Sequence, residues 1–101
     1  MDDYYEWDEQ KRQSNIRKHG VDFGAAVGFD WETALVLQDE RFTYTEARSV
    51  AIGWLEGRLH VLVFQDRRER IRLISLRRTT PQEGRLYAAW ARANQEGRDF
   101  P

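Results

Sequence analysis

Residues 48–78 of the chain, RSVAIGWLEGRLHVLVFQDRRERIRLISLRR, decide its fold. Runs of β-branched and apolar residues are interrupted by Glu56-Gly57 and by the charged segment 66–69, a pattern typical of strands joined by tight turns. We therefore expect strands over residues 48–55, 58–65 and 70–76, arranged as an antiparallel meander. The middle strand is apolar on both faces, which predicts a central position in the sheet.

Simple alternation along the last of these strands separates two sets of side chains. It places Ile71, Leu73 and Ser75 on one face of the sheet. It places on the other face the remaining set, Arg70, Arg72, Ile74, Leu76 and Arg78.

The segments before the meander predict a short strand and two helices. A strand is expected over residues 3–7, and a helix over residues 9–19 with Asp8 as its N-cap and Gly20 just past its end. Asp22 is the expected N-cap of a second, short helix. Residues 33–39 are apolar and β-branched enough for a further strand.

The segment after the meander predicts a C-terminal helix. Thr80 and Glu83 have the spacing of a capping box, with proline at the first helical position. The apolar face of this helix is expected to contain Leu86, Ala89, Trp90 and Ala93. The whole pattern predicts the α+β class: an antiparallel four- to five-stranded sheet with two N-terminal helices and one C-terminal helix packed on one side of it.

Composition limits the kinds of protein that this chain can be. The length of 101 residues predicts a single domain, 1–101, and 41% hydrophobic residues suffice for a core. The chain has no cysteine, so disulfides and thiolate metal sites are excluded. No apolar run approaches the ~20 residues of a membrane-spanning helix. We expect a cytoplasmic protein that does not contact a membrane.

The distribution of charge is more informative than its sum. The net charge is -1, yet arginines gather near the end of the predicted sheet. Such a cluster favours a polyanionic partner. It consists of Arg67, Arg68, Arg70, Arg72, Arg77 and Arg78.

The residues that can carry chemistry point to phosphodiester cleavage or to plain binding. No metal-ligand spacing, glycine-rich phosphate loop or dinucleotide motif is present. Cleaving RNA without a metal ion requires a base, an acid and cations around the phosphate. Arg72, Arg77 and Arg78 suit the phosphate, whereas Lys18, His19 and Glu46 suit the proton transfers. The same arginines equally fit a solvated sheet face or surface ion pairs, so enzyme and binding module both stay open.

The sequence also resembles a known family, the BrnT-type toxins. The resemblance rests on Glu6-Trp7-Asp8 with Lys11, Asn15 and residues 18–23 (KHGVDF), on residues 39–41 with Glu46, Arg48 and residues 51–53, and on residues 71–78. It covers roughly residues 5–90. In the middle motif, Ser49-Val50 stands where a bulkier pair is expected.

The resemblance implies a RelE-like fold and a type II toxin–antitoxin system. The protein would be an endoribonuclease that inhibits translation and needs no cofactor or metal. Its partner would be a BrnA-type ribbon-helix-helix antitoxin, and DNA would be contacted only through that antitoxin. The catalytic residues implied are Lys18, His19, Glu46, Arg48, Arg72 and Arg77, and we expect Lys11, Arg70 and Arg78 to bind RNA. The alternative is a non-catalytic RNA- or protein-binding module of the same fold.

Overall fold

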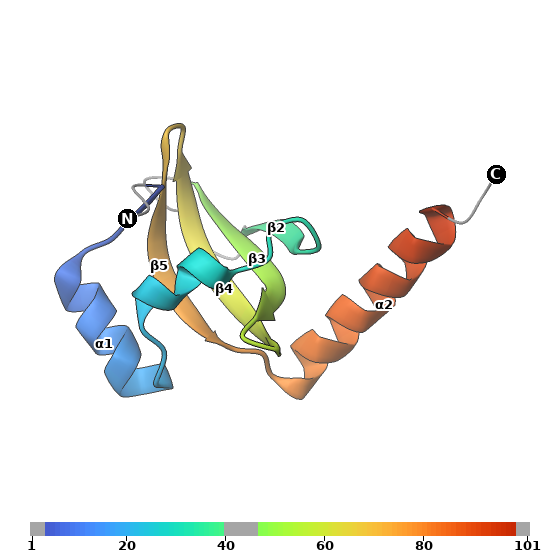
Figure 1. The fold of residues 1–101 in the computed structure, drawn as a ribbon, viewed down its shortest axis with the longest axis horizontal. Coiled ribbons are helices and arrows are strands. Elements are labelled where there is room, and N and C mark those ends of the chain that lie inside the picture. Colours follow the sequence, from blue (N-terminus) through green and yellow to red (C-terminus); the bar gives the residue numbers. More distant parts are fainter. Residues whose placement is uncertain (1–3, 40–46, 99–101) are drawn as a thin grey trace.

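Five strands form one curved sheet in the order β1-β5-β4-β3-β2 in the computed structural model, which describes residues 4–39 and 47–98 (Figure 1). The α+β class is confirmed. The strands are β1 (Tyr5–Glu6), β2 (Leu35–Asp39), β3 (Arg48–Leu55), β4 (Arg58–Arg67) and β5 (Arg70–Arg78). The helices are α1 (Glu9–His19), the 3-10 helix η1 (Phe23–Gly28) and α2 (Pro81–Arg98).

The predicted meander β3-β4-β5 is confirmed, and β4 is central as expected. Its two antiparallel pairings run from Ser49↔Phe64 to Leu55↔Arg58 and from His60↔Arg78 to Arg67↔Arg70. The β3–β4 turn needs positive φ at both of its central residues, which are Glu56 (φ 51) and Gly57 (φ 78). The sheet is mixed rather than wholly antiparallel, because β1 pairs with β5 in parallel.

A β-bulge in β5 overturns the alternation predicted for that strand. Val63 pairs with Ser75 and Phe64 pairs with Leu73, so Ile74 is an extra residue. Because of this extra residue, side chains before and after Ile74 that simple alternation would place on opposite faces lie on the same face. Leu76 is fully buried on the same side as Leu73, and Arg72 and Arg77 share the opposite side.

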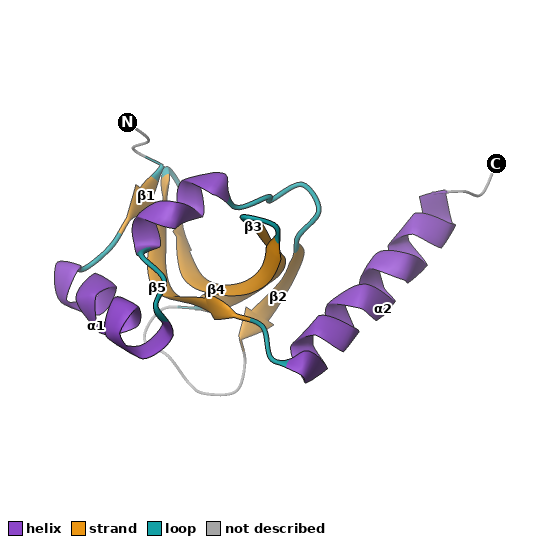
Figure 2. Ribbon diagram, turned by 60° about the horizontal axis from the view of Figure 1, so that its bottom comes forward, coloured by secondary structure: helices purple, strands orange, loops and turns teal. Residues whose placement is uncertain are grey.

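The helices cover both faces of the sheet, so the prediction that they all pack on one side is wrong. On one face, called the η1 face here, Leu62 and Leu76 pack in one core cluster with Phe23 and Ala26 of η1. Figure 2 shows η1 lying across the inside of the curved sheet. On the other face, called the α2 face, Leu35, Ile52 and Val61 form a second cluster with Tyr87 of α2.

Of the four residues predicted for the packed face of α2, Trp90 packs on the sheet and the other three do not. Tyr87 is buried, with Trp90 and Ala91 beside it, whereas Leu86 is 50% exposed and Ala89 and Ala93 are exposed.

The predicted capping box is present: the Thr80 backbone N–H donates to Glu83 Oε1 (2.8 Å) and the Glu83 N–H donates to Thr80 Oγ1 (3.2 Å). From this fixed start the helix extends away from the sheet (Figure 1). No helix within residues 4–39 and 47–98 is long and apolar enough to cross a membrane.

Candidate functional site

Helix α1 begins and ends as the sequence predicts. The Asp8 carboxylate accepts a hydrogen bond from the Gln10 N–H (2.8 Å), and Gly20 adopts a left-handed conformation (φ 71) at the C-terminal end. Its backbone N–H donates to the Ile16 carbonyl oxygen at 2.8 Å. Ile16 is the one apolar residue in the sequence of α1, and it is exposed. Apolar packing alone therefore does not hold α1 against the sheet.

The side chain of Asn15 attaches α1 to the edge of β5. Asn15 Nδ2 donates to the Leu76 carbonyl oxygen (2.7 Å), and Asn15 Oδ1 accepts from the Leu76 N–H (3.1 Å). Nδ2 also donates to the Val21 carbonyl oxygen (2.9 Å), so Asn15, only 5% exposed, satisfies backbone groups in two segments. Helix α1 therefore lies along β5 at a fixed position, beyond the part of that strand that β1 covers.

A second contact fixes the segment that follows α1. Arg12 Nε and Nη2 donate to the two carboxylate oxygens of Asp22, both at 2.9 Å. These hydrogen bonds lower the pKa of Asp22 below its ordinary value, with a further contribution from the Gly24 N–H, and they raise the pKa of Arg12. The C-terminal end of α1, where the predicted residues Lys18 and His19 lie, is thus held in place on both sides.

These contacts create a small basic hollow between α1 and β5, which we call the edge hollow. Lys11, Asn15 and Lys18 follow one another at helical spacing, so the Asn15 attachment directs both lysines along β5. The volume of the hollow is about 180 Å³, and no carboxylate of residues 4–39 and 47–98 lines it. Its lining consists of Lys11, Ser14, Asn15, Lys18, His19, Ile74 and Ser75.

Two predicted arginines lie on the α2 face of β5, on either side of Ser75 along the strand. Arg72 Nη1 donates to Glu6 Oε2 (2.9 Å). Arg77 forms a bidentate pair with Glu83, with both N···O distances 2.7 Å. The Arg77 hydrogen bonds are the largest of the effects that lower the pKa of Glu83 to about 2. Each guanidinium group is therefore held in a fixed orientation by a carboxylate.

The remaining residues predicted for the site are spread across the sheet. Arg48 starts β3 on the α2 face and pairs in register with Asp39 of β2. Arg70 is exposed at the start of β5. Glu46 lies outside the residues that the structure describes. The structure thus gathers Lys11, Lys18 and His19 in the edge hollow, puts Arg72 and Arg77 on the neighbouring strand face, and leaves Arg48 and Arg70 at its margins.

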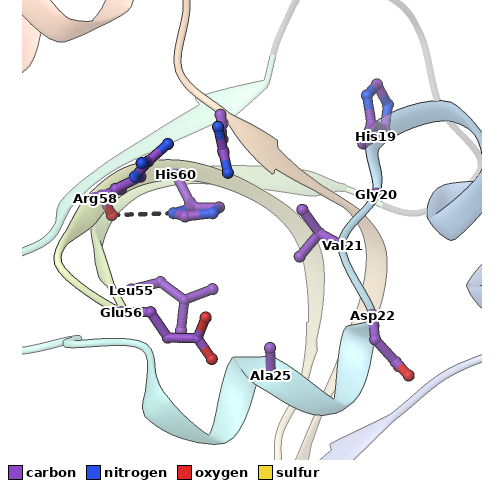
Figure 3. Close-up of a pocket in the computed structure, with 10 residues that line it drawn as sticks. His19, Gly20, Val21, Asp22, Ala25, Leu55, Glu56, Arg58 and His60 are labelled. Carbon is purple, nitrogen blue, oxygen red and sulfur yellow. Dashed lines mark hydrogen bonds between the residues drawn. The ribbon is translucent and has the colours of Figure 1, made fainter.

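Arg78 is the predicted residue that the structure separates from this group. It lines a different hollow of about 320 Å³ on the η1 face, together with Arg58, His60 and His19 (Figure 3). His60 is 6% exposed, and its Nδ1 lies 3.0 Å from the Arg58 carbonyl oxygen. That contact assigns the ring proton to Nδ1 in the neutral form and leaves Nε2 as an acceptor. Sequence reasoning singled out neither Arg58 nor His60 as a site residue, and no local motif marks them.

Charge distinguishes the two hollows as sites for a polyanion. The hollow on the η1 face has the carboxylates of Asp22 and Glu56 in its lining, opposing the guanidinium groups of Arg58 and Arg78. Figure 3 shows Glu56 on the floor of that hollow, below His60. The edge hollow has two lysines and, among the residues that the structure describes, no acid. A phosphate group is therefore favoured more strongly at the edge hollow.

Within the described part of the chain, no three His, Cys, Asp or Glu side chains are grouped as ligands for a metal ion. A small α+β protein whose lysines and arginines gather along one strand is suited to hold a nucleic acid backbone. Residues 7–83 match the family model of the ribonuclease toxin BrnT of type II toxin–antitoxin systems, and the chain belongs to this family. It is therefore a ribonuclease toxin, with RNA as substrate and a cognate antitoxin as partner. A search of curated proteins finds no match to the chain.

Proposed function

We propose that the chain is a single-domain endoribonuclease of the cytoplasm. It cleaves RNA at the edge hollow without a metal ion and thereby stops translation. The observation that carries this proposal is the grouping of Lys11, Lys18 and His19 beside Ser75, with no carboxylate in the described part of the lining. Arg72 and Arg77 flank Ser75 on β5. Lysine, histidine and arginine side chains supply both the cations and the proton donors that metal-free cleavage needs.

In this mechanism a ribose 2′-oxygen attacks the adjacent phosphorus while the bond from phosphorus to the 5′-oxygen breaks. A base removes the 2′-hydroxyl proton, and an acid protonates the leaving 5′-oxygen. His19 lines the edge hollow at the C-terminal end of α1, beside Lys18, so we assign the acid role to His19. The proposed base is Glu46, which the family resemblance supplies and which lies outside the residues that the structure describes. The products are a 2′,3′-cyclic phosphate and a 5′-hydroxyl end.

The cations around the phosphate have separate tasks. Lys18, in the edge hollow, and Arg72 stabilise the charge that develops on the phosphate oxygens. Arg72 uses one of its five N–H donors on Glu6 among the described residues, so it has further donors with which to bind the substrate. Arg77 holds Glu83 through both of its oxygens, which gives it a structural task, and its contact with phosphate stays a prediction. Lys11 and the marginal residues Arg48 and Arg70 bind flanking phosphates, and the same role for Arg78 stays a prediction.

We further propose that the antitoxin is a BrnA-type ribbon-helix-helix protein, which contacts DNA on behalf of the complex. Support comes from membership of the toxin family, whose systems pair the toxin with a cognate antitoxin. A gel-shift assay with the promoter DNA of the operon tests this. We expect the complex to shift the DNA and the isolated toxin to leave it unshifted.

The catalytic proposal is tested with purified protein and end-labelled RNA. We expect cleavage to persist in excess EDTA and to stop when the ribose at the cleaved position is a 2′-deoxyribose. Lys18→Ala is expected to lower the rate by about 10²–10³, because it removes one group that stabilises the transition state. Arg17→Ala is the matched control, since Arg17 is the exposed neighbour outside the hollow. Loss of activity in EDTA, or cleavage of the deoxy substrate, contradicts the mechanism.

A further inference from the structure

An aromatic pocket of about 420 Å³ lies where α2 leaves the sheet, on the same α2 face that bears Arg72 and Arg77. Trp54 of β3 pairs in register with Leu59 and contacts Tyr87 of α2, which places this pocket on the α2 face. The lining consists of Asp30, Thr33, Trp54, Tyr87, Trp90, Ala91 and Asn94. The family match ends at residue 83, so every lining residue from α2 lies beyond it.

The rings of the pocket are arranged around a buried tyrosine. Trp54 and Tyr87 meet edge to face, with ring centroids 6.2 Å apart and planes at 88°, and Tyr87 and Trp90 are 5.7 Å apart at 51°. Tyr87 is 5% exposed, whereas Trp54 is 43% exposed. Trp54 therefore presents indole surface to solvent on a rigid base, which is the arrangement on which a nucleobase stacks.

Three hydrogen bonds fix the side of the pocket opposite α2. The Asp30 N–H donates to the Trp54 carbonyl oxygen (3.0 Å), and the Thr33 hydroxyl donates to Asp30 Oδ2 (2.9 Å). The Tyr87 hydroxyl donates to the Thr33 carbonyl oxygen (2.8 Å). These bonds hold the Asp30 carboxylate and the aromatic rings in one geometry without a ligand, so binding requires little further ordering.

The polar groups of the pocket favour one kind of base. Asp30 Oδ1 and Oδ2 each accept one internal hydrogen bond, from the Glu32 N–H and the Thr33 hydroxyl, and each carboxylate oxygen has capacity for another. Two adjacent acceptors match two adjacent N–H donors, and guanine is the base that presents two such donors on its Watson–Crick edge. The Asn94 carboxamide adds a donor and an acceptor at the rim.

We propose that this pocket binds a guanine base of the RNA substrate, stacked on Trp54 with its N–H donors on Asp30. The inference rests on the proposed function, because it takes the RNA backbone to run along β5. Helix α2 connects the two places: Glu83 pairs with Arg77, and Trp90 lies about 10 Å further along the helix axis. A guanine close to the cleaved bond can thus reach the pocket, which gives this toxin a base preference.

The test uses 2′-O-methylated pentanucleotides, which cannot be cleaved, with G, A, U or C at one position in an otherwise constant sequence. Binding is measured by fluorescence anisotropy. We expect the G oligonucleotide to bind about tenfold more tightly than the others, and Trp54→Leu to remove that advantage. Trp54→Phe keeps a ring and should retain most of the affinity. Asp30→Asn should lower the preference for guanine while stacking persists.

Tyr4→Leu is the control, since Tyr4 is an exposed aromatic residue outside the pocket lining, and urea unfolding verifies that each variant is folded. Equal binding of the four oligonucleotides overturns the inference, and so does a Trp54→Leu variant that binds RNA normally. If Trp54→Leu instead weakens antitoxin binding alone, the pocket is a protein interface and the inference is wrong. Guanine-dependent binding without cleavage of unmodified RNA would support guanine binding at the pocket and overturn the proposed function.

Discussion

The carboxamide of Asn15 pairs with the backbone of Leu76 as a neighbouring strand would, donating to its carbonyl oxygen and accepting from its N–H. One side chain thus continues the sheet past its edge and attaches a helix that has little apolar surface. The lysines of the edge hollow lie on the same helix, so this pairing links the stability of the fold to the position of the site.

Replacing Asn15 by alanine should destabilise the protein by about 2–4 kcal/mol, because the Leu76 N–H and carbonyl groups lose their partner in a buried place. Urea unfolding measures the change. Gln13→Ala, at an exposed position of the same helix, should change the free energy of unfolding by less than about 0.5 kcal/mol. Equal stability of the two variants would show that Asn15 does not hold α1.

Replacing Gly53 by alanine should also destabilise the protein, by about 1–3 kcal/mol. A methyl group there would lie 2.8 Å from Phe29 Cζ and 3.1 Å from Ala34 Cβ, in the segment that carries Asp30 against β3. Gly28→Ala is the control, since its added methyl group meets Leu55 Cδ1 at an ordinary 3.5 Å. Thermal unfolding of both variants checks this, and a wild-type melting temperature for Gly53→Ala would rule out the close packing.

The pair between Arg77 and Glu83 should make stability depend on pH in the acid range. The folded pKa of Glu83 is about 2, below its ordinary value of 4.5. A lowered carboxyl pKa contributes stability that is complete above pH 4.5 and is lost as the pH falls towards 2. Glu83→Gln should therefore be less stable than wild type at pH 7, with the difference shrinking between pH 4.5 and 2. A difference that stays constant over this range would contradict the pair.

RNA binding should depend on salt through the lysines of the edge hollow. Lys11→Gln removes one phosphate contact, so the slope of log affinity against log salt concentration should fall by about 0.7. Arg17→Gln, which removes an exposed charge outside the hollow, should leave the slope closer to that of wild type. Anisotropy titrations at several salt concentrations measure both, and equal slopes for the two variants would place the RNA elsewhere.

The local signals in the sequence predicted most of the fold. Asp8 and the Thr80–Glu83 box begin helices where expected and Gly20 ends one, because caps act through neighbouring backbone groups. The bulge at Ile74 could not be predicted, since it depends on how β5 pairs with β4. That one residue decides that Arg72 and Arg77 share a face. The packed face of α2 was predicted only at Trp90, for a similar reason: the sheet contacts Tyr87, whereas the apolar stripe alone favours Leu86.

The candidate site was predictable in its residue types more than in its grouping. Lys18 and His19 were found from the end of α1 and from the family motif, and the structure places them together. The family motif includes Asn15, but nothing in the sequence predicts that its side chain attaches α1 to β5, because a polar residue on a polar helix is expected in solvent. Arg78 was grouped with Arg77 as its neighbour, yet adjacent residues of a strand point to opposite faces.

The most direct test of the central claim is expression of the chain alone in bacteria, with growth and total RNA followed after induction. Wild type and the control Arg85→Ala, an exposed arginine of α2, should arrest growth with loss of RNA. Arg72→Ala should grow normally while staying folded, because its partly exposed pair with Glu6 contributes little to stability. Growth arrest and RNA loss in folded Arg72→Ala at the wild-type level would contradict the account.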